Sequence, residues 1–126
     1  MDIRKKQKAV VAALEDIKAR EVAAFNVTHL TSLFDRVIIA TADSARQTKA
    51  LAVHVRERMK ALGERVLGLE GEAGGEWVLV DLGDVVVHIM QPAVRQHYNL
   101  EELWDQPAPR AKRPRSKPKP VERPAP

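Results

Sequence analysis

The stretch GEWVLVDLGDVVVHIMQPAVRQHYNLEELW, residues 75–104, decides the fold, and it contains both tryptophans and the only tyrosine of the chain. Segments 77–82 and 85–90 are dense in β-branched and aliphatic residues, and the Gly83-Asp84 pair between them suits a two-residue turn. The sequence therefore predicts a β-hairpin, around which the rest of the chain should be arranged.

The two faces of this hairpin differ in chemistry. The turn pairs Val80 with Val87 and Val78 with Ile89, so one face is wholly aliphatic and should belong to the core. The opposite face, named the mixed face, carries Trp77, Leu79, Asp81, Val86, His88 and Met90. Two interpretations of the mixed face are open: a partner docks on it, or a helix of the same chain covers it and leaves its ionisable groups paired internally.

The remaining segments supply further strands and helices. The apolar patterns predict, in order, helix 2–20, strand 21–27, loop 28–35 with room for one helical turn, strand 36–42, helix 45–62, strand 65–70 and, after the hairpin, a helical segment 92–104. Segment 36–42 has no polar alternation, which is typical of a strand buried on both faces. The order predicts an α/β fold: a single domain with a mixed sheet of about five strands and flanking helices.

Composition divides the chain near residue 105. Seven of the eight prolines lie after it, and residues 105–126 hold seven Lys or Arg against two acidic residues. Such a segment cannot build a core, so we expect a single domain over 1–104 and a disordered Pro/Lys/Arg-rich tail over 105–126 that adds non-specific contact with RNA. The domain keeps 14 basic and 15 acidic residues, a net charge of −1, which argues against an electrostatic nucleic-acid binder.

The composition also predicts a cytoplasmic location. The chain has no cysteine, so it can form neither disulfides nor thiolate metal sites, which fits a reducing compartment. No apolar run approaches the roughly 20 residues of a membrane span, and no apolar segment with a cleavage site follows the Lys/Arg-rich start. We therefore expect neither export nor membrane contact.

No group of residues fits catalysis, a metal or a cofactor. Asp81 and Asp84 would support Mg²⁺ chemistry only at a shared site, but Asp81 lies on a strand face and Asp84 in the turn, which it should stabilise. The four histidines lack metal-ligand spacing, and no serine lies in an elbow motif. The best small-anion candidate is the start of helix 45–62, at Arg46 and Gln47, and a solvated first turn is the ordinary alternative.

Three segments closely resemble the Iojap-like ribosomal silencing factor (RsfS) family. They are VIIATADSARQ at 37–47, LEGEAGGEWVLVDLGDVVVHIM at 69–90 and RQHYNLEELW at 95–104, and the match runs in order through nearly all of residues 5–104. The resemblance implies a nucleotidyltransferase-like α/β fold. It also implies a protein that is not an enzyme, and the chain lacks the Gly-Ser and paired-Asp pattern of that superfamily's catalysts.

The resemblance further implies a translation repressor that binds the large ribosomal subunit at the universal ribosomal protein L-fourteen. Bound there, it would block an intersubunit bridge and keep the small subunit from joining under starvation; the resemblance also allows a homodimer. The residues predicted to bind the ribosomal protein are Trp77, Asp81, His88, Met90, Arg95 and Tyr98. A nucleotidyltransferase-like enzyme and an RNA-binding module that uses the basic tail are the competing interpretations.

Overall fold

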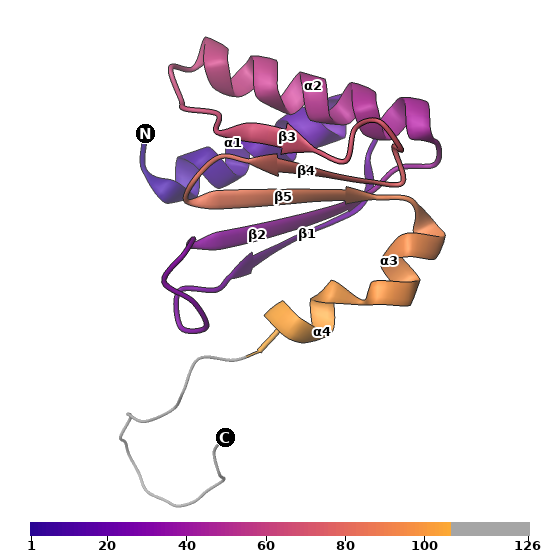
Figure 1. Ribbon diagram of the computed structural model, residues 1–126. Helices are drawn as coiled ribbons and strands as arrows, with labels where there is room; N and C mark the ends of the chain where they lie inside the picture. Colours follow the sequence, from indigo (N-terminus) through magenta and orange to yellow (C-terminus); the bar gives the residue numbers. More distant parts are fainter. Residues whose placement is uncertain (107–126) are drawn as a thin grey trace, which may run out of the picture.

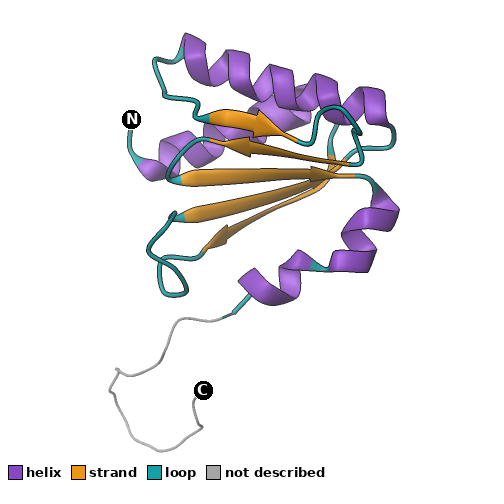
Figure 2. Ribbon diagram, in the orientation of Figure 1, coloured by secondary structure: helices purple, strands orange, loops and turns teal. Residues whose placement is uncertain are grey.

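A five-stranded mixed sheet carries the fold, and helices lie on both of its faces (Figure 1). Helices α1 (Ile3–Asp16) and α2 (Ala45–Ala61) cover one face, whereas α3 (Pro92–Tyr98) and α4 (Leu100–Trp104) lie against the other (Figure 2). The predicted α/β fold is thereby confirmed.

The computed structural model describes residues 1–106. Disorder is predicted for the tail, residues 105–126. Residues 107–126 lie outside the described range, so this stays a prediction.

The sheet is built from β1 (Arg20–Asn26), β2 (Arg36–Thr41), β3 (Gly68–Glu70), β4 (Trp77–Asp81) and β5 (Val85–Met90). The strand order is β1-β2-β5-β4-β3, with β2 and β5 parallel and every other neighbouring pair antiparallel. In the β4–β5 hairpin, Val80 pairs with Val87 and Val78 with Ile89. This is the predicted register, and it puts every second hairpin residue on the aliphatic face.

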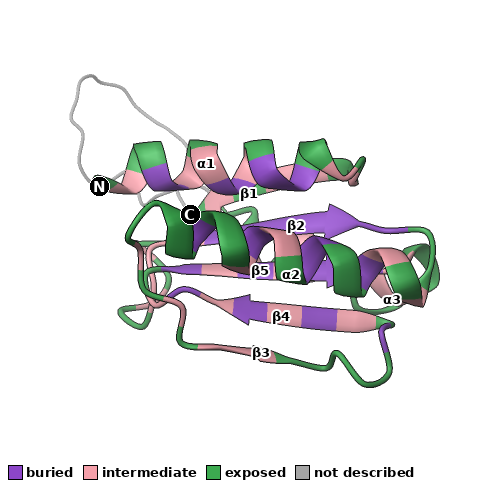
Figure 3. Ribbon diagram, turned by 90° about the horizontal axis from the view of Figure 1, so that it is seen from above, coloured by how far each residue is buried: buried purple, intermediate pink, exposed green. Residues whose placement is uncertain are grey.

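The aliphatic face of the hairpin forms the main core. Leu51, Val55 and Met59 of α2 and Val10 and Leu14 of α1 are fully buried against it. Strand β2 is an inner strand of the sheet, between β1 and β5, and residues 37–41 are all buried (Figure 3). A strand in this position needs apolar side chains on both faces, which explains its lack of polar alternation.

Several predicted boundaries shift in the structure. Helix α1 ends at Asp16 rather than near residue 20, because Lys18 takes a left-handed conformation with φ of 61°. Segment 28–35 contains no helix, but one turn closes where the N–H groups of Leu30 and Thr31 donate to Val27 O. Strand β3 begins only at Gly68.

A buried lysine connects α1 to the hairpin turn. Lys6 Nζ donates to Asp84 Oδ1 at 2.6 Å and to Leu82 O at 3.0 Å, and it lies 3.3 Å from Glu64 Oε1. Asp84 therefore holds the turn through Lys6. The side chain that bonds within the turn is instead Asp81, whose Oδ1 accepts from the N–H of Gly83 at 2.9 Å.

Candidate docking surface

The chain's own C-terminal helices cover part of the mixed face. Met90 is fully buried with Val27, Val37 and Ile39, and the partly buried side chains packed on this cluster are Phe25, Phe34, Trp77, Val94, Leu100 and Trp104. Met90 was predicted to bind a ribosomal protein. Because its side chain is enclosed, it can support a docking surface from beneath but offers no contact area of its own.

Two other predicted residues, Trp77 and His88, are bonded to each other. The indole Nε1–H of Trp77 donates to Nδ1 of His88 at 3.0 Å, and the ring centroids lie 5.8 Å apart. An indole nitrogen can only donate, so Nδ1 carries no proton and the neutral imidazole is protonated at Nε2. Burial lowers the pKa of His88 from 6.5 to about 4. His88 is therefore a neutral donor at physiological pH.

Tyr98 extends this pair outward from α3. Its ring lies 5.0 Å from that of Trp77 and 4.9 Å from that of His97, and its side chain is 56% exposed. Tyr98 is thus an exposed aromatic ring supported by the partly buried Trp77, and exposed aromatic groups of this kind are typical of protein interfaces. The structure thus brings Trp77, His88 and Tyr98 into one patch, and their contact with a ribosomal protein stays a prediction.

Arg95, which we predicted at the rim of the docking surface, is engaged within the fold. Its side chain is only 11% exposed and forms an ion pair with Glu101 at 2.7 Å. Its Nη1 donates to Glu21 O at 2.7 Å and to Thr41 Oγ1 at 2.8 Å. Arg95 therefore fixes α3 against β1, β2 and α4, and its direct contact with a partner stays a prediction.

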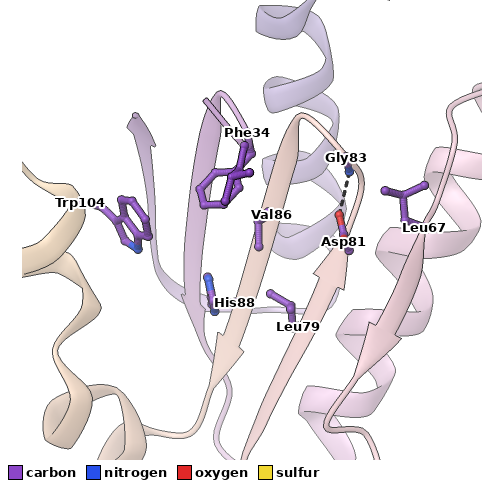
Figure 4. A pocket seen from close by; sticks show the side chains of 9 residues that line it. Phe34, Leu67, Leu79, Asp81, Gly83, Val86, His88 and Trp104 are labelled. Atoms are coloured by element: carbon purple, nitrogen blue, oxygen red, sulfur yellow. Dashed lines mark hydrogen bonds between the residues drawn. The ribbon is translucent and has the colours of Figure 1, made fainter. Parts of the chain in front are cut away.

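The uncovered part of the mixed face is hollowed. One hollow of about 610 Å³, named the groove, is lined by Leu33, Phe34, Leu67, Leu79, Asp81, Gly83, Val86, His88 and Trp104. Figure 4 shows Phe34 and Trp104 on one side of it, Leu67 on the other and the hairpin side chains between them. A second hollow, of about 300 Å³, shares Leu79 and His88 with the groove and reaches Trp77. The two hollows form one recessed strip.

Among residues 1–106, Asp81 is the one charged side chain that lines the groove. Its Oδ1 accepts the Gly83 N–H, and within residues 1–106 no Lys or Arg forms an ion pair with it. The carboxylate therefore keeps capacity to accept hydrogen bonds from a cationic partner.

Sequence reasoning missed the leucines at the groove rim. Leu33 is 80% exposed in the loop before β2, and Leu67 is 52% exposed just before β3. Loop 28–35 also contains the apolar residues Leu30 and Phe34, so no local pattern singled out Leu33. Its position opposite Leu67 depends on strand order, which no local pattern gives.

The geometry offers little to catalysis. Within the part of the chain that the structure describes, no three His, Asp or Glu side chains are grouped so that they could hold a metal ion. At the start of α2, the amide nitrogen of Gln47 donates to the carbonyl groups of Ile17 and Lys18, and its oxygen accepts the N–H of Asp43. These contacts favour a structural role for Gln47 over anion binding. Among residues 1–106, no helix has the length and apolarity needed to cross a bilayer.

A family model described as "Ribosomal silencing factor during starvation" matches residues 1–125. The chain belongs to the ribosomal silencing factor family. The ribosomal silencing factor RsfS of Chromobacterium violaceum is 52% identical over 104 residues, which are 82% of this chain and 85% of that protein. The RsfS of Bacillus subtilis is 36% identical over 97 residues, covering 77% of this chain and 82% of its own length. A crystal structure of a protein from Chromobacterium violaceum has a TM-score of 0.82 and 50% identity, covering 86% of this chain and 91% of that one.

Membership of the RsfS family confirms the resemblance found in segments 37–47, 69–90 and 95–104. The family role is ribosome silencing, which is regulatory rather than enzymatic. The mixed face, with its aromatic patch and its groove, is the candidate surface for contact with a partner in this role.

Proposed function

We propose that this chain represses translation by docking on ribosomal protein L-fourteen of the large subunit, where it blocks an intersubunit bridge and keeps the small subunit from joining. Family membership supports ribosome silencing. A mouse relative, 29% identical over 98 residues, is named mitochondrial assembly of ribosomal large subunit protein 1, which supports the large subunit as partner.

The observation that carries the proposal is the aromatic patch on the hairpin strands and α3, in which the partly buried Trp77 and His88 support the exposed ring of Tyr98. Its polar atoms are already arranged: Trp77 bonds His88, and His88 is neutral. Binding therefore desolvates no charged group at the centre of the patch, which removes a major cost of association. Truncating an interface aromatic of this kind typically weakens binding by about 2 kcal/mol.

Repression by occupying a surface requires no chemical step. The proposed site contains no nucleophile with an adjacent base and, within residues 1–106, no group suited to a metal. Binding to large subunits should accordingly be unchanged by added nucleotide or Mg²⁺ chelation, at concentrations that leave the subunits intact. Nucleotide turnover by the purified protein would favour the competing enzyme interpretation.

The test compares fold stability with inhibition of subunit joining for Trp77→Ala, Tyr98→Ala and a control, Leu62→Ala. Leu62 is 40% exposed at the end of α2, on the opposite side of the sheet. We expect the control to inhibit joining of purified subunits normally. The two aromatic variants should unfold cooperatively, Tyr98→Ala near the wild-type temperature, yet inhibit joining at least tenfold less well. Folded aromatic variants with full inhibition would contradict docking through this patch.

Asp81→Lys gives a second test based on charge. We expect the reversed charge to weaken association with a basic ribosomal protein, and the effect to diminish at high salt. Because Asp81 also bonds Gly83, Asp81→Asn serves as the control: its amide oxygen can keep that bond without the charge. Both variants are tested for sedimentation with large subunits. Asp81→Asn reports the loss of the charge alone, whereas Asp81→Lys also loses the hydrogen bond to Gly83.

A further inference from the structure

The groove is lined mainly by apolar side chains, and two of them are largely exposed to solvent. Its rims are Leu33, 80% exposed, and Leu67, 52% exposed, and its floor is formed by Leu79 and Val86. Leu33 and Leu67 belong to different loops, yet both line one hollow of about 610 Å³. Exposed leucines gathered around a hollow are costly in water and mark a surface that is covered in a complex.

Only a few polar groups interrupt this surface, and each has a defined chemistry. His88 is protonated at Nε2, and no residue within 1–106 accepts a hydrogen bond from that atom. Asp81 supplies a carboxylate with one hydrogen bond, from Gly83. The indole N–H of Trp104 is buried in the groove wall without a partner among the described residues. The groove thus combines an anionic acceptor, a neutral donor and an apolar lining in which four aliphatic side chains lie beside Phe34 and Trp104.

We propose that the groove binds a segment of a basic large-subunit protein that inserts an aliphatic side chain between Leu33 and Leu67 and places an adjacent Lys or Arg against Asp81. A carbonyl group of the same segment accepts from His88 Nε2. This inference rests on the proposed function. The inference adds two things to the proposed function: the residues that recognise the partner, and the chemistry of the partner segment that they recognise.

The charge of the groove favours a protein over ribosomal RNA. Among residues 1–106, no Lys or Arg lines it, and the one ionised group that does is a carboxylate, which repels phosphate. Neutral RNA bases bind best where cations lie beside stacking surfaces. The groove offers the rings of Phe34 and Trp104 without a cation among residues 1–106, whereas its exposed leucines match aliphatic side chains. The chain's own segment 107–126 carries cations, but Val121 is its only large aliphatic residue, which is little to fill the hollow.

The binding test uses full-length protein and purified large subunits. We expect Leu33→Ser and Leu67→Ser each to weaken binding about tenfold or more, with an unchanged melting temperature, because both side chains are largely exposed in the unbound protein. The matched control is Val53→Ser, since Val53 is 38% exposed on α2, on the opposite side of the sheet. Asp81→Asn should weaken binding and reduce its salt dependence.

A photo-crosslink identifies the occupant. Benzoylphenylalanine placed at position 33 of the full chain, irradiated on purified large subunits, should give an adduct with a ribosomal protein, at a peptide that contains Lys or Arg beside an aliphatic residue. An adduct with ribosomal RNA, with residues 107–126 or with a second copy of the chain would overturn the inference. The proposed function has its own readout: it fails if the wild-type chain does not sediment with large subunits, whereas normal sedimentation with unaffected Leu33 and Leu67 variants refutes only the groove inference.

Discussion

Acidification should destabilise the fold through His88. Burial lowers the pKa of this residue to about 4 in the folded protein, whereas a histidine in an unfolded chain titrates near 6.5. Between these two values the unfolded state binds a proton that the folded state excludes, so the free energy of unfolding decreases as the pH falls. The contribution is complete above pH 6.5, and it is lost progressively as the pH falls toward 4.

The structure gives both the size and the cause of the effect. The His88 pKa is near 6.5 in the unfolded chain and about 4 in the folded protein, and each pKa unit corresponds to about 1.4 kcal/mol. The free energy of unfolding therefore decreases by about 2 kcal/mol at pH 5 and by about 3 kcal/mol below pH 4. Burial is the main cause. The bond from Trp77 acts in the same direction, because protonation of His88 Nδ1 would place two N–H donors against each other at 3.0 Å.

Urea unfolding followed by tryptophan fluorescence, from about pH 7.5 to about pH 5, measures this loss. The comparison is with His88→Gln, whose amide oxygen can accept the Trp77 N–H but which does not titrate. Carboxylates titrate equally in both proteins, so the difference between the two pH profiles isolates His88. Parallel profiles would refute the reasoning, as would an NMR titration of the His88 ring with a pKa near 6.5.

Four further outcomes are expected. Lys6→Met, which leaves Asp84 and Leu82 O without their cation, should lower the free energy of unfolding by about 3 kcal/mol in urea titrations. Gly75→Ala should cost about 2 kcal/mol or more, because its φ is +74° and a Cβ would lie 2.7 Å from that of Ala45; Gly74→Ala, with open space around it, should cost less than half as much. A chain ending at Trp104 should still sediment with large subunits at moderate salt, so complete loss of binding would contradict the role given to the tail. Light scattering should show a dimer that forms with concentration, and a constant monomer mass up to tens of micromolar would count against it.

The sequence predicted those parts of the fold in which local pattern and packing agree. Alternating valines fixed the β4–β5 register, because a slip by one residue would expose Val78, Val80 and their partners. The lack of polar alternation at 36–42 predicted a strand buried on both faces, and β2 is buried along residues 37–41. In both cases one strong requirement, burial of aliphatic side chains, decides the structure.

The candidate site was predictable only in part, because its form depends on contacts between distant segments. The pattern gave the membership of the mixed face, but not which half of it α3 and α4 cover. That choice depends on Arg95, which reaches Glu21 and Thr41 more than 50 residues away along the chain. In this position α3 and α4 enclose Met90 and leave the β4 side of the mixed face open. Likewise, no local signal joins Leu33 to Leu67 across the groove.

The covered and open halves of the mixed face have complementary roles. Leu100 and Trp104 pack over the β2 side. The aromatic patch lies on the hairpin strands and α3, and the groove combines hairpin side chains with the loop residues Leu33 and Leu67. On the open side, the ionisable groups of the hairpin are bonded within the hairpin itself: Trp77 to His88, and Asp81 to Gly83. A surface prepared in this way loses little conformational entropy on binding and desolvates only one charge, that of Asp81. The occlusion that we propose would depend on such a surface, because its strength is set by the affinity and the position of the contact.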